Sequence, residues 1–108
     1  MHPATQTVTI EGLRHVATSA IPDDVRVWLY GSRARGDARS DSDWDILIIA
    51  AKDKRENDDF ELYSVPFIDY GFDCGQVVMP HFYTESQWRE FAHTPFATNV
   101  ERDKIALN

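Results

Sequence analysis

Residues 25–49 read VRVWLYGSRARGDARSDSDWDILII, and this stretch decides the fold. The apolar residues Val25–Tyr30 predict a strand that runs into the small-residue turn Gly31–Ser32. A short charged helix or turn is expected over Arg33–Arg39, and a second strand, Asp43–Ala50, opens with two carboxylates. Each piece is common by itself, but the order strand, Gly-Ser, ten residues, Asp-x-Asp, strand is specific as a whole.

The turn at Gly31 and Ser32 has the properties of a phosphate-binding turn. Gly31 permits a positive φ and lets the backbone approach an anion closely. Ser32 adds a hydroxyl and a backbone N–H at the point where a helix begins. A helix start carries unpaired donors and about half a positive charge, so this turn is predicted to bind phosphate.

Two carboxylates mark the start of the second strand. Side chains alternate along a strand, so Asp43 and Asp45 share one face, with Cα atoms roughly 7 Å apart, and Trp44 faces the core. Oxygen ligands of this kind suit Mg²⁺, which leaves room for waters and substrate phosphates. A solvated strand end explains them less well, because Asp is depleted in strands and two on one face repel each other without a cation.

The string GSRARGDARSDSDWDILI closely resembles the signature of the DNA polymerase β-like nucleotidyltransferase superfamily. Gly31 and Ser32 match the family's phosphate-binding pair, and Asp43 and Asp45 match its metal ligands. With 108 residues, the chain resembles the minimal nucleotidyltransferases in particular. Those proteins are often encoded beside a helical HEPN-domain partner, as the antitoxin to an RNase-like toxin.

The resemblance implies an α/β (α+β) fold: a two-layer nucleotidyltransferase-like domain over residues 1–108, with a mixed β-sheet and helices packed mainly on one face. It also implies transfer of a nucleotide monophosphate, AMP from ATP in the first instance, to an acceptor hydroxyl. The cofactor would be Mg²⁺ or Mn²⁺, held by Asp43 and Asp45. Ser32 and the backbone of Gly31–Arg33 would bind the nucleoside triphosphate, and the implied protein partner is a HEPN-like helical toxin.

The family usually supplies a third carboxylate from a later strand, and the sequence departs from that pattern. We expect the later strand over Phe72–Met79, and alignment through Pro80 places Val77 at the usual acidic position. Asp73 has the same strand parity as Val77 but lies roughly 13 Å away along a regular strand. Either a bulge at Gly75 brings Asp73 beside the other carboxylates as a third catalytic residue, or the third carboxylate is absent.

Composition and charge exclude several classes of protein. The length suits one domain, and the net charge of −7 argues against a broad nucleic-acid surface, which needs a basic stripe. The single cysteine, Cys74, excludes an intrachain disulfide and a multi-cysteine zinc site. The N-terminus has no signal-peptide pattern and no apolar run approaches a membrane span, so we expect a cytoplasmic protein. The sequence leaves homo-oligomer formation open.

Strands alternate with helices along the chain, which supports a two-layer domain. Helical spacing predicts an amphipathic helix near the N-terminus and another that Pro66 should kink or shorten. Lys52–Asp59 is typical of a charged surface loop. Capping signals predict two more helices, beginning after Thr84 and Thr94, and Ile105–Leu107 is either a final strand or a tail.

Other polar and aromatic side chains have a structural interpretation beside a functional one. Arg33 and its neighbours Arg35 and Arg39 can contact phosphate, but with interleaved Asp residues they are also typical of an ion-paired, solvated helix. His81 and His93 lack the spacing of a helical metal pair, so the sequence favours no site role for either. The aromatic face of the C-terminal helices is expected to be core more often than a partner-binding stripe; its members are Trp88, Phe91 and Phe96.

Two classes of function fit these observations. The first is a metal-dependent nucleotidyltransferase that modifies its toxin. The alternative is a catalytically weak or inactive nucleotidyltransferase-like antitoxin, a binding module that acts by docking to its partner. The intact Gly-Ser and Asp-x-Asp pairs favour the first class, and the missing third carboxylate favours the second. An Asp-x-Asp glycosyltransferase fits less well, since it would not require the Gly-Ser turn.

Overall fold

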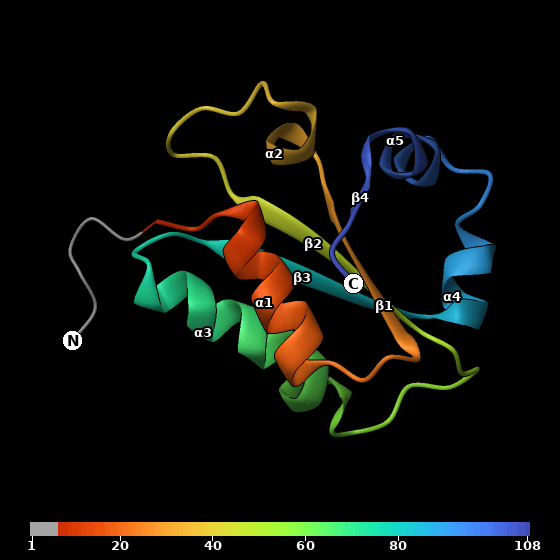
Figure 1. The fold of residues 1–108 in the computed structure, drawn as a ribbon. Coiled ribbons are helices and arrows are strands. Elements are labelled where there is room, and N and C mark those ends of the chain that lie inside the picture. The colour runs from red at the N-terminus through yellow and green to blue at the C-terminus, as the bar shows by residue number, and fades with distance from the viewer. Residues whose placement is uncertain (1–6) are drawn as a thin grey trace.

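A mixed four-stranded sheet, in the order β3-β2-β1-β4, forms the centre of the computed structural model, which describes residues 7–108 (Figure 1). β1 (Val25–Tyr30) and β2 (Trp44–Ala50) pair antiparallel. β3 (Val78–Thr84) runs parallel to β2, and β4 (Ile105–Ala106) runs antiparallel to β1. The predicted α+β fold with one mixed sheet is therefore confirmed.

One face of the sheet is covered by α1 (Ile10–Ala20) and α3 (Val65–Asp73), as Figure 1 shows. The apolar positions that recur at helical spacing in α1 turn toward the strands. Alternate residues of the central strands meet them, so the main core lies between sheet and helices. Its fully buried members include Leu13, Ala17, Val27, Leu29, Ile46, Ile48 and Phe67.

The opposite face of the sheet is covered only in part, by α4 (Glu85–Glu90) and α5 (Pro95–Asp103). A smaller apolar cluster forms there around Tyr30, Leu47 and Val100, and Trp88 of α4 packs against it. The aromatic face of the C-terminal helices therefore contributes to packing, as predicted, although Phe91 and Phe96 stay 38% and 40% exposed. The uncovered part of this face lies where β2 begins.

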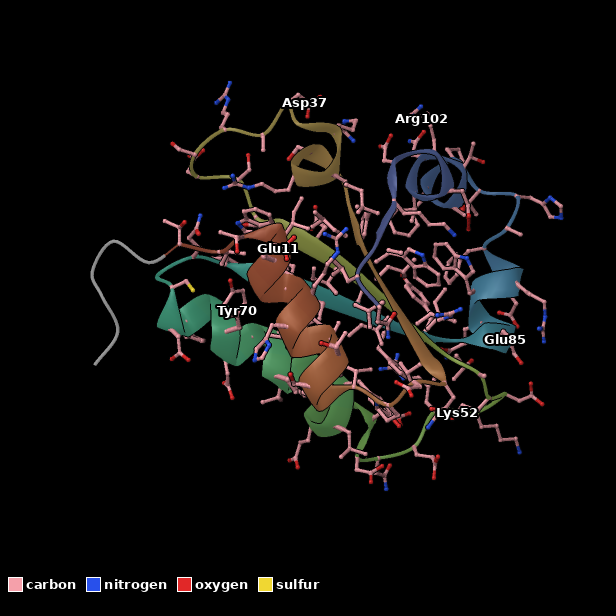
Figure 2. The ribbon with its side chains drawn as sticks, viewed as in Figure 1. Glu11, Asp37, Lys52, Tyr70, Glu85 and Arg102 are labelled. Carbon is pink, nitrogen blue, oxygen red and sulfur yellow. The ribbon has the colours of Figure 1, made fainter. Side chains whose placement is uncertain are left out.

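The helices on the covered face are joined through Tyr70 of α3, which reaches toward the start of α1 (Figure 2). Its hydroxyl accepts a hydrogen bond from the backbone N–H of Thr9 at 3.2 Å and occupies the space that a side chain on Gly12 would need. The Thr9 hydroxyl in turn accepts a bond from the Gly12 N–H at 2.9 Å, which caps α1. This contact fixes α1 against α3.

The prediction of a third strand over Phe72–Met79 is wrong, because α3 continues to Asp73 and β3 begins only beyond the following turn. Gly75, with a φ of 68°, ends the helical segment, and the backbone N–H of Gln76 donates to the carbonyl oxygen of Gly71 at 2.9 Å. A glycine in the left-handed conformation is a common helix stop. The glycine that predicts a bulge therefore terminates a helix instead.

The predicted helix starts at Thr84 and Thr94 are confirmed, since each hydroxyl accepts the backbone N–H three residues later at 3.2 Å. Pro66 lies in the first turn of α3, and the chain before it forms a π-helical turn, η1 (Phe60–Ser64). The proline therefore shortens the α-helix, as predicted. None of the helices within residues 7–108 has the length and apolar character that crossing a membrane requires.

The two edge strands of the sheet, β3 and β4, accommodate Pro80 and the C-terminal residue. Pro80 lies inside β3, where the edge of the sheet tolerates a residue without an N–H. At the other edge, the final-strand interpretation of the C-terminus is the correct one. The Asn108 side chain extends that pairing, because it accepts from the Val27 N–H at 2.9 Å and donates to the Val25 carbonyl oxygen at 2.7 Å.

Candidate functional site

The candidate site lies at the end of the two central strands where β1 ends and β2 begins, and its first element is Gly31. This residue connects β1 to the short helix α2 (Ser32–Arg35) and has φ 79° and ψ −158°, a conformation essentially restricted to glycine. The N–H groups of Ala34 and Arg35 donate to its carbonyl oxygen, each at 3.0 Å. The chain therefore turns into a helix start at this point, as the sequence predicts.

The second element is the carboxylate of Asp45, which lies directly against this turn. Tyr30 and Asp45 are register partners in the antiparallel pair of β1 and β2. A Cβ atom on Gly31 would lie only 2.7 Å from Asp45 Oδ2. The absence of a side chain at Gly31 is therefore what allows the helix start and the carboxylate to meet.

Asp43 completes the predicted carboxylate pair. It is exposed, directly precedes β2 and has the strand parity of Asp45, whereas Trp44 between them is buried in the main core, as predicted. Burial raises the pKa of Asp45; the nearby His81 lowers it, and the negative charge of Asp43 raises it further. A half-buried carboxylate beside a like charge fits a divalent cation, which relieves both the desolvation and the repulsion.

The neighbouring positions at Val77, directly before β3, and at Met79 within it are apolar. The Trp44 N–H donates to the Val77 carbonyl oxygen at 3.0 Å, which places Val77 beside Asp43, and Met79 is the register partner of Asp45. Both side chains are exposed, at 54% and 41%. The adjacent strand therefore supplies no carboxylate next to the pair.

Asp73 does not occupy the strand position expected for it. It is the last residue of α3, because the helix runs on through the segment expected to be extended. Within residues 7–108, no group of three or more His, Cys, Asp or Glu side chains is arranged to hold a metal ion. Substrate phosphates and water would have to complete the coordination of a cation at Asp43 and Asp45.

The Arg33 side chain is engaged in structural contacts. Its guanidinium Nη2 donates to the carbonyl oxygens of Ser40 and Ser42, at 3.2 and 3.0 Å, and its central carbon lies 4.4 Å from the centroid of the Trp44 ring. These contacts hold the loop before Asp43 against the start of β2. The group of Arg33 that can face an anion is its backbone N–H, which lies at the start of α2.

The structure adds His81 and Tyr30 to the site, neither of which the sequence analysis selects. The ring centroids of Tyr30 and His81 are 6.0 Å apart, and burial together with the charge of Asp45 raises the pKa of the Tyr30 hydroxyl. His81 lies two residues after Met79 on β3 and so shares its face of the sheet, and this spacing is the signal that could have found it. A third strand placed too early in the chain hides that signal.

Comparison with known proteins agrees with this arrangement. The chain is similar to a solved structure described as the crystal structure of a toxin–antitoxin with AMP-PNP, with a TM-score of 0.64 and 20% sequence identity, over 94% of this chain and 73% of that chain. At this identity the likeness concerns the fold alone. No curated protein matches the chain. The family model of the nucleotidyltransferase domain matches residues 10–98, which include β1, α2, β2 and β3. The chain therefore belongs to the nucleotidyltransferase domain family.

Proposed function

We propose that the protein is a metal-dependent nucleotidyltransferase of the minimal type, which transfers AMP from ATP to an acceptor hydroxyl of a HEPN-type toxin. The contact between Gly31 and Asp45 carries this proposal, because it sets a helix start that suits phosphate against a carboxylate that suits a cation. The solved toxin–antitoxin structure with AMP-PNP supports the choice of an adenine nucleotide and of a toxin as the partner.

Each group of the site has a distinct task in this proposal. The backbone N–H groups at the start of α2 and the Ser32 hydroxyl bind the terminal phosphates. Asp43 and Asp45 hold a divalent cation, which supplies charge neutralisation on the transferring phosphate. The acceptor hydroxyl oxygen forms a bond to the α-phosphorus, the bond to the bridging oxygen breaks, pyrophosphate leaves, and the hydroxyl proton passes to water.

Calorimetry of ATP binding tests the nucleotide site. We expect binding with Mg²⁺, and loss of binding with a chelator or in the Asp45→Ala variant. Asp41→Ala is the matched control, because Asp41 is an exposed acid in the loop just before the pair. If ATP binds equally well in the presence of the chelator, in Asp45→Ala and in Asp41→Ala, the carboxylate pair does not take part in nucleotide binding.

An exposed apolar patch beside the site suits the protein partner. It consists of Phe72, Val77 and Met79, which are 79%, 54% and 41% exposed. Phe72 and Val77 line one shallow cavity of about 100 Å³. A partner seated on this apolar patch would hold its acceptor hydroxyl next to Asp43 and Asp45. The net charge of −7 favours a partner surface whose apolar centre has a basic rim.

A pair of phenylalanine variants tests the docking surface. The product of the neighbouring gene is mixed with the protein, and complex formation is measured by size-exclusion chromatography. We expect Phe72→Ser to weaken the complex. Phe60→Ser is the control, since Phe60 is also exposed, at 54%, and lies at the far end of the η1–α3 helix. Equal complexes with both variants would exclude the patch.

The apolar residues beside the carboxylates favour a second candidate function, an antitoxin that acts by docking alone. Val77 and Met79 stand where an acidic residue would complete the metal site. Intact mass spectrometry of the partner after incubation with ATP and Mg²⁺ separates the two functions. A mass increase of one AMP supports transfer. A stable complex with no mass increase, in which the toxin is inactive, supports docking alone.

A further inference from the structure

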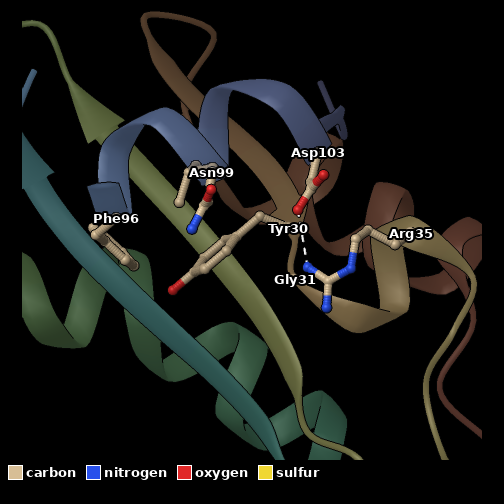
Figure 3. Close-up of a pocket in the computed structure, with 7 residues that line it drawn as sticks. Tyr30, Gly31, Arg35, Phe96, Asn99 and Asp103 are labelled. Atoms are coloured by element: carbon tan, nitrogen blue, oxygen red, sulfur yellow. Dashed lines mark hydrogen bonds and ion pairs between the residues drawn. The ribbon is translucent and has the colours of Figure 1, made fainter. Parts of the chain in front are cut away.

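A cavity of about 150 Å³ opens beside Gly31, on the side of the turn that faces α5 (Figure 3). The end of β1, helix α2 and helix α5 each contribute to its wall. Six of the residues that line it are Tyr30, Gly31, Arg35, Phe96, Asn99 and Asp103. The cavity therefore shares Gly31 with the proposed phosphate site.

The volume of this cavity limits what it can hold. Sites that enclose a whole small-molecule ligand have volumes of roughly 300–1,000 Å³. A space of about 150 Å³ accommodates only part of a ligand, such as one planar ring system. Because Gly31 forms one wall, the remainder of that ligand would extend along the turn toward α2.

The charge of the wall excludes a second phosphate site. Arg35 donates to Asp103 at 2.9 Å and to Asp37 at 3.2 Å, so two carboxylates accompany one guanidinium. The Asp103 side chain is only 7% exposed, and its ion pair fixes α5 against α2. With its one lining cation already paired, the cavity suits an uncharged group better than an anion.

Two side chains of α5 supply the contacts that an uncharged aromatic ring requires. Phe96 is 40% exposed, and its ring lies nearly perpendicular to Tyr30, with centroids 6.0 Å apart. Figure 3 shows Phe96 and Asn99 extending from α5 toward Tyr30. Within residues 7–108 the Asn99 amide makes no hydrogen bond to another side chain or to the backbone. It therefore has a free donor and a free acceptor at the cavity.

We infer that this cavity binds the nucleobase of the triphosphate, with adenine as the base, and that Phe96 and Asn99 are its recognition residues. The inference rests on the proposed function, because it requires a nucleotide whose phosphates lie at Gly31 and Ser32. The amino group of adenine and an adjacent ring nitrogen match the paired acceptor and donor of a carboxamide. The Phe96 ring offers an apolar surface for stacking.

Binding of ATP, GTP and inorganic tripolyphosphate, each with Mg²⁺, tests the inference in three variants. We expect Asn99→Ala and Phe96→Ala each to weaken ATP binding about tenfold and to leave tripolyphosphate binding unchanged. Asn99→Ala should also narrow the preference for ATP over GTP. Thr98→Ala is the matched control: Thr98 is an exposed neighbour on α5 outside the cavity, and its variant should bind all three as the unmodified protein does.

The outcomes separate this inference from the proposed function. If ATP binds no more tightly than tripolyphosphate, or if Asn99→Ala weakens both ligands equally, the base site is overturned while the phosphate site stands. If neither ligand binds in the presence of Mg²⁺, the proposed function fails and the base site fails with it. Thermal melting shows whether Phe96→Ala folds normally. If it does not, the ATP and tripolyphosphate affinities of Asn99→Ala alone test the base site.

Discussion

Gly31 and Asp45 lie so close together that a methyl group on Gly31 would lie 2.7 Å from Asp45 Oδ2. The two residues are separated along the chain by α2 and a loop, yet the antiparallel pairing of β1 and β2 brings them into contact. The approach of the Gly31 turn to the Asp45 carboxylate thus follows from backbone register. A ligand that touches both needs no loop movement to reach them.

Replacing Gly31 by alanine should therefore damage stability and nucleotide binding together. The substitution combines a backbone conformation essentially restricted to glycine with a clash against Asp45. We expect Gly31→Ala to lower the free energy of unfolding by roughly 1–3 kcal/mol through backbone strain, and to abolish ATP binding because the methyl group displaces the Asp45 carboxylate. Urea unfolding and calorimetry measure the two effects.

Gly36→Ala is the control for backbone strain alone. Gly36 also has a positive φ, 84°, but a Cβ there would meet nothing within 4 Å. We expect a loss of about 1 kcal/mol and normal ATP affinity. Similar losses of affinity in both variants would show that strain in this segment, and not the contact with Asp45, controls the site.

Asp45→Asn should stabilise the protein in the absence of metal. Burial raises the pKa of Asp45, His81 lowers it and the charge of Asp43 raises it, and the net pKa lies above its ordinary value. Ionisation of this residue therefore opposes folding. At a pH below the unfolded pKa of about 3.9, the protonated acid and the amide should have similar stability. The melting temperature of the variant should rise relative to the native protein as pH increases toward 7.

Added Mg²⁺ should reverse that order at pH 7, because only the native carboxylate gains from binding the cation. The gain is about 2.7 kcal/mol when the free cation is at a hundred times its dissociation constant. Asp41→Asn should follow the native protein at every pH. An Asp45→Asn variant that is no more stable than the native protein in chelator at pH 7 would contradict the burial argument.

Arg33→Lys should destabilise the loop before Asp43 although it keeps the positive charge. A lysine cannot donate to Ser40 and Ser42 together while its charge lies flat on the Trp44 ring. We expect a loss of about 1–2 kcal/mol in the free energy of unfolding, measured in urea. Arg39→Lys, an exposed substitution in the same loop, should cost little, and equal losses in both would show that the effect does not depend on the contacts of Arg33.

Val77→Asp should tighten binding of the divalent cation, because Val77 lies beside Asp43, directly before the adjacent strand β3. A third carboxylate adds a charged ligand, and we expect a roughly tenfold lower dissociation constant for Mn²⁺. Val77→Asn is the matched control for the loss of the apolar side chain. If aspartate and asparagine at this position bind Mn²⁺ equally, residue 77 does not face the cation.

The sequence predicts the turn and the carboxylate pair well because they depend on neighbouring antiparallel strands. The parity of Asp43, Trp44 and Asp45 decides which side chains face the core, and the buried Trp44 leaves only one register. Over residues 25–49, the residue types and the strand pairing therefore indicate the same structure. The same reasoning places Gly31 at the start of a helix without any knowledge of the rest of the chain.

The third strand could not be placed in the same way, because β3 is parallel to β2 and reaches it through η1 and α3. Residues Phe72–Val77 alternate enough to imitate a strand, and only the packing of Gly71 against Val78 shows that the helix continues. A similar limit applies to Asp59, which is expected in a surface loop but is only 2% exposed. Burial raises the pKa of Asp59, but hydrogen bonds from the Glu56 N–H and from Lys52 outweigh this effect, so the pKa lies below its ordinary value. Such contacts depend on residues far from any motif.

The two edges of the sheet have a consequence for behaviour at high concentration. An exposed strand edge is a template on which another chain can add a strand, and such addition leads to aggregation. β4 is only two residues long, and β3 carries Pro80, which has no N–H to donate. Both edges are therefore poor templates, so the protein can keep an open sheet edge beside its site without polymerising through it.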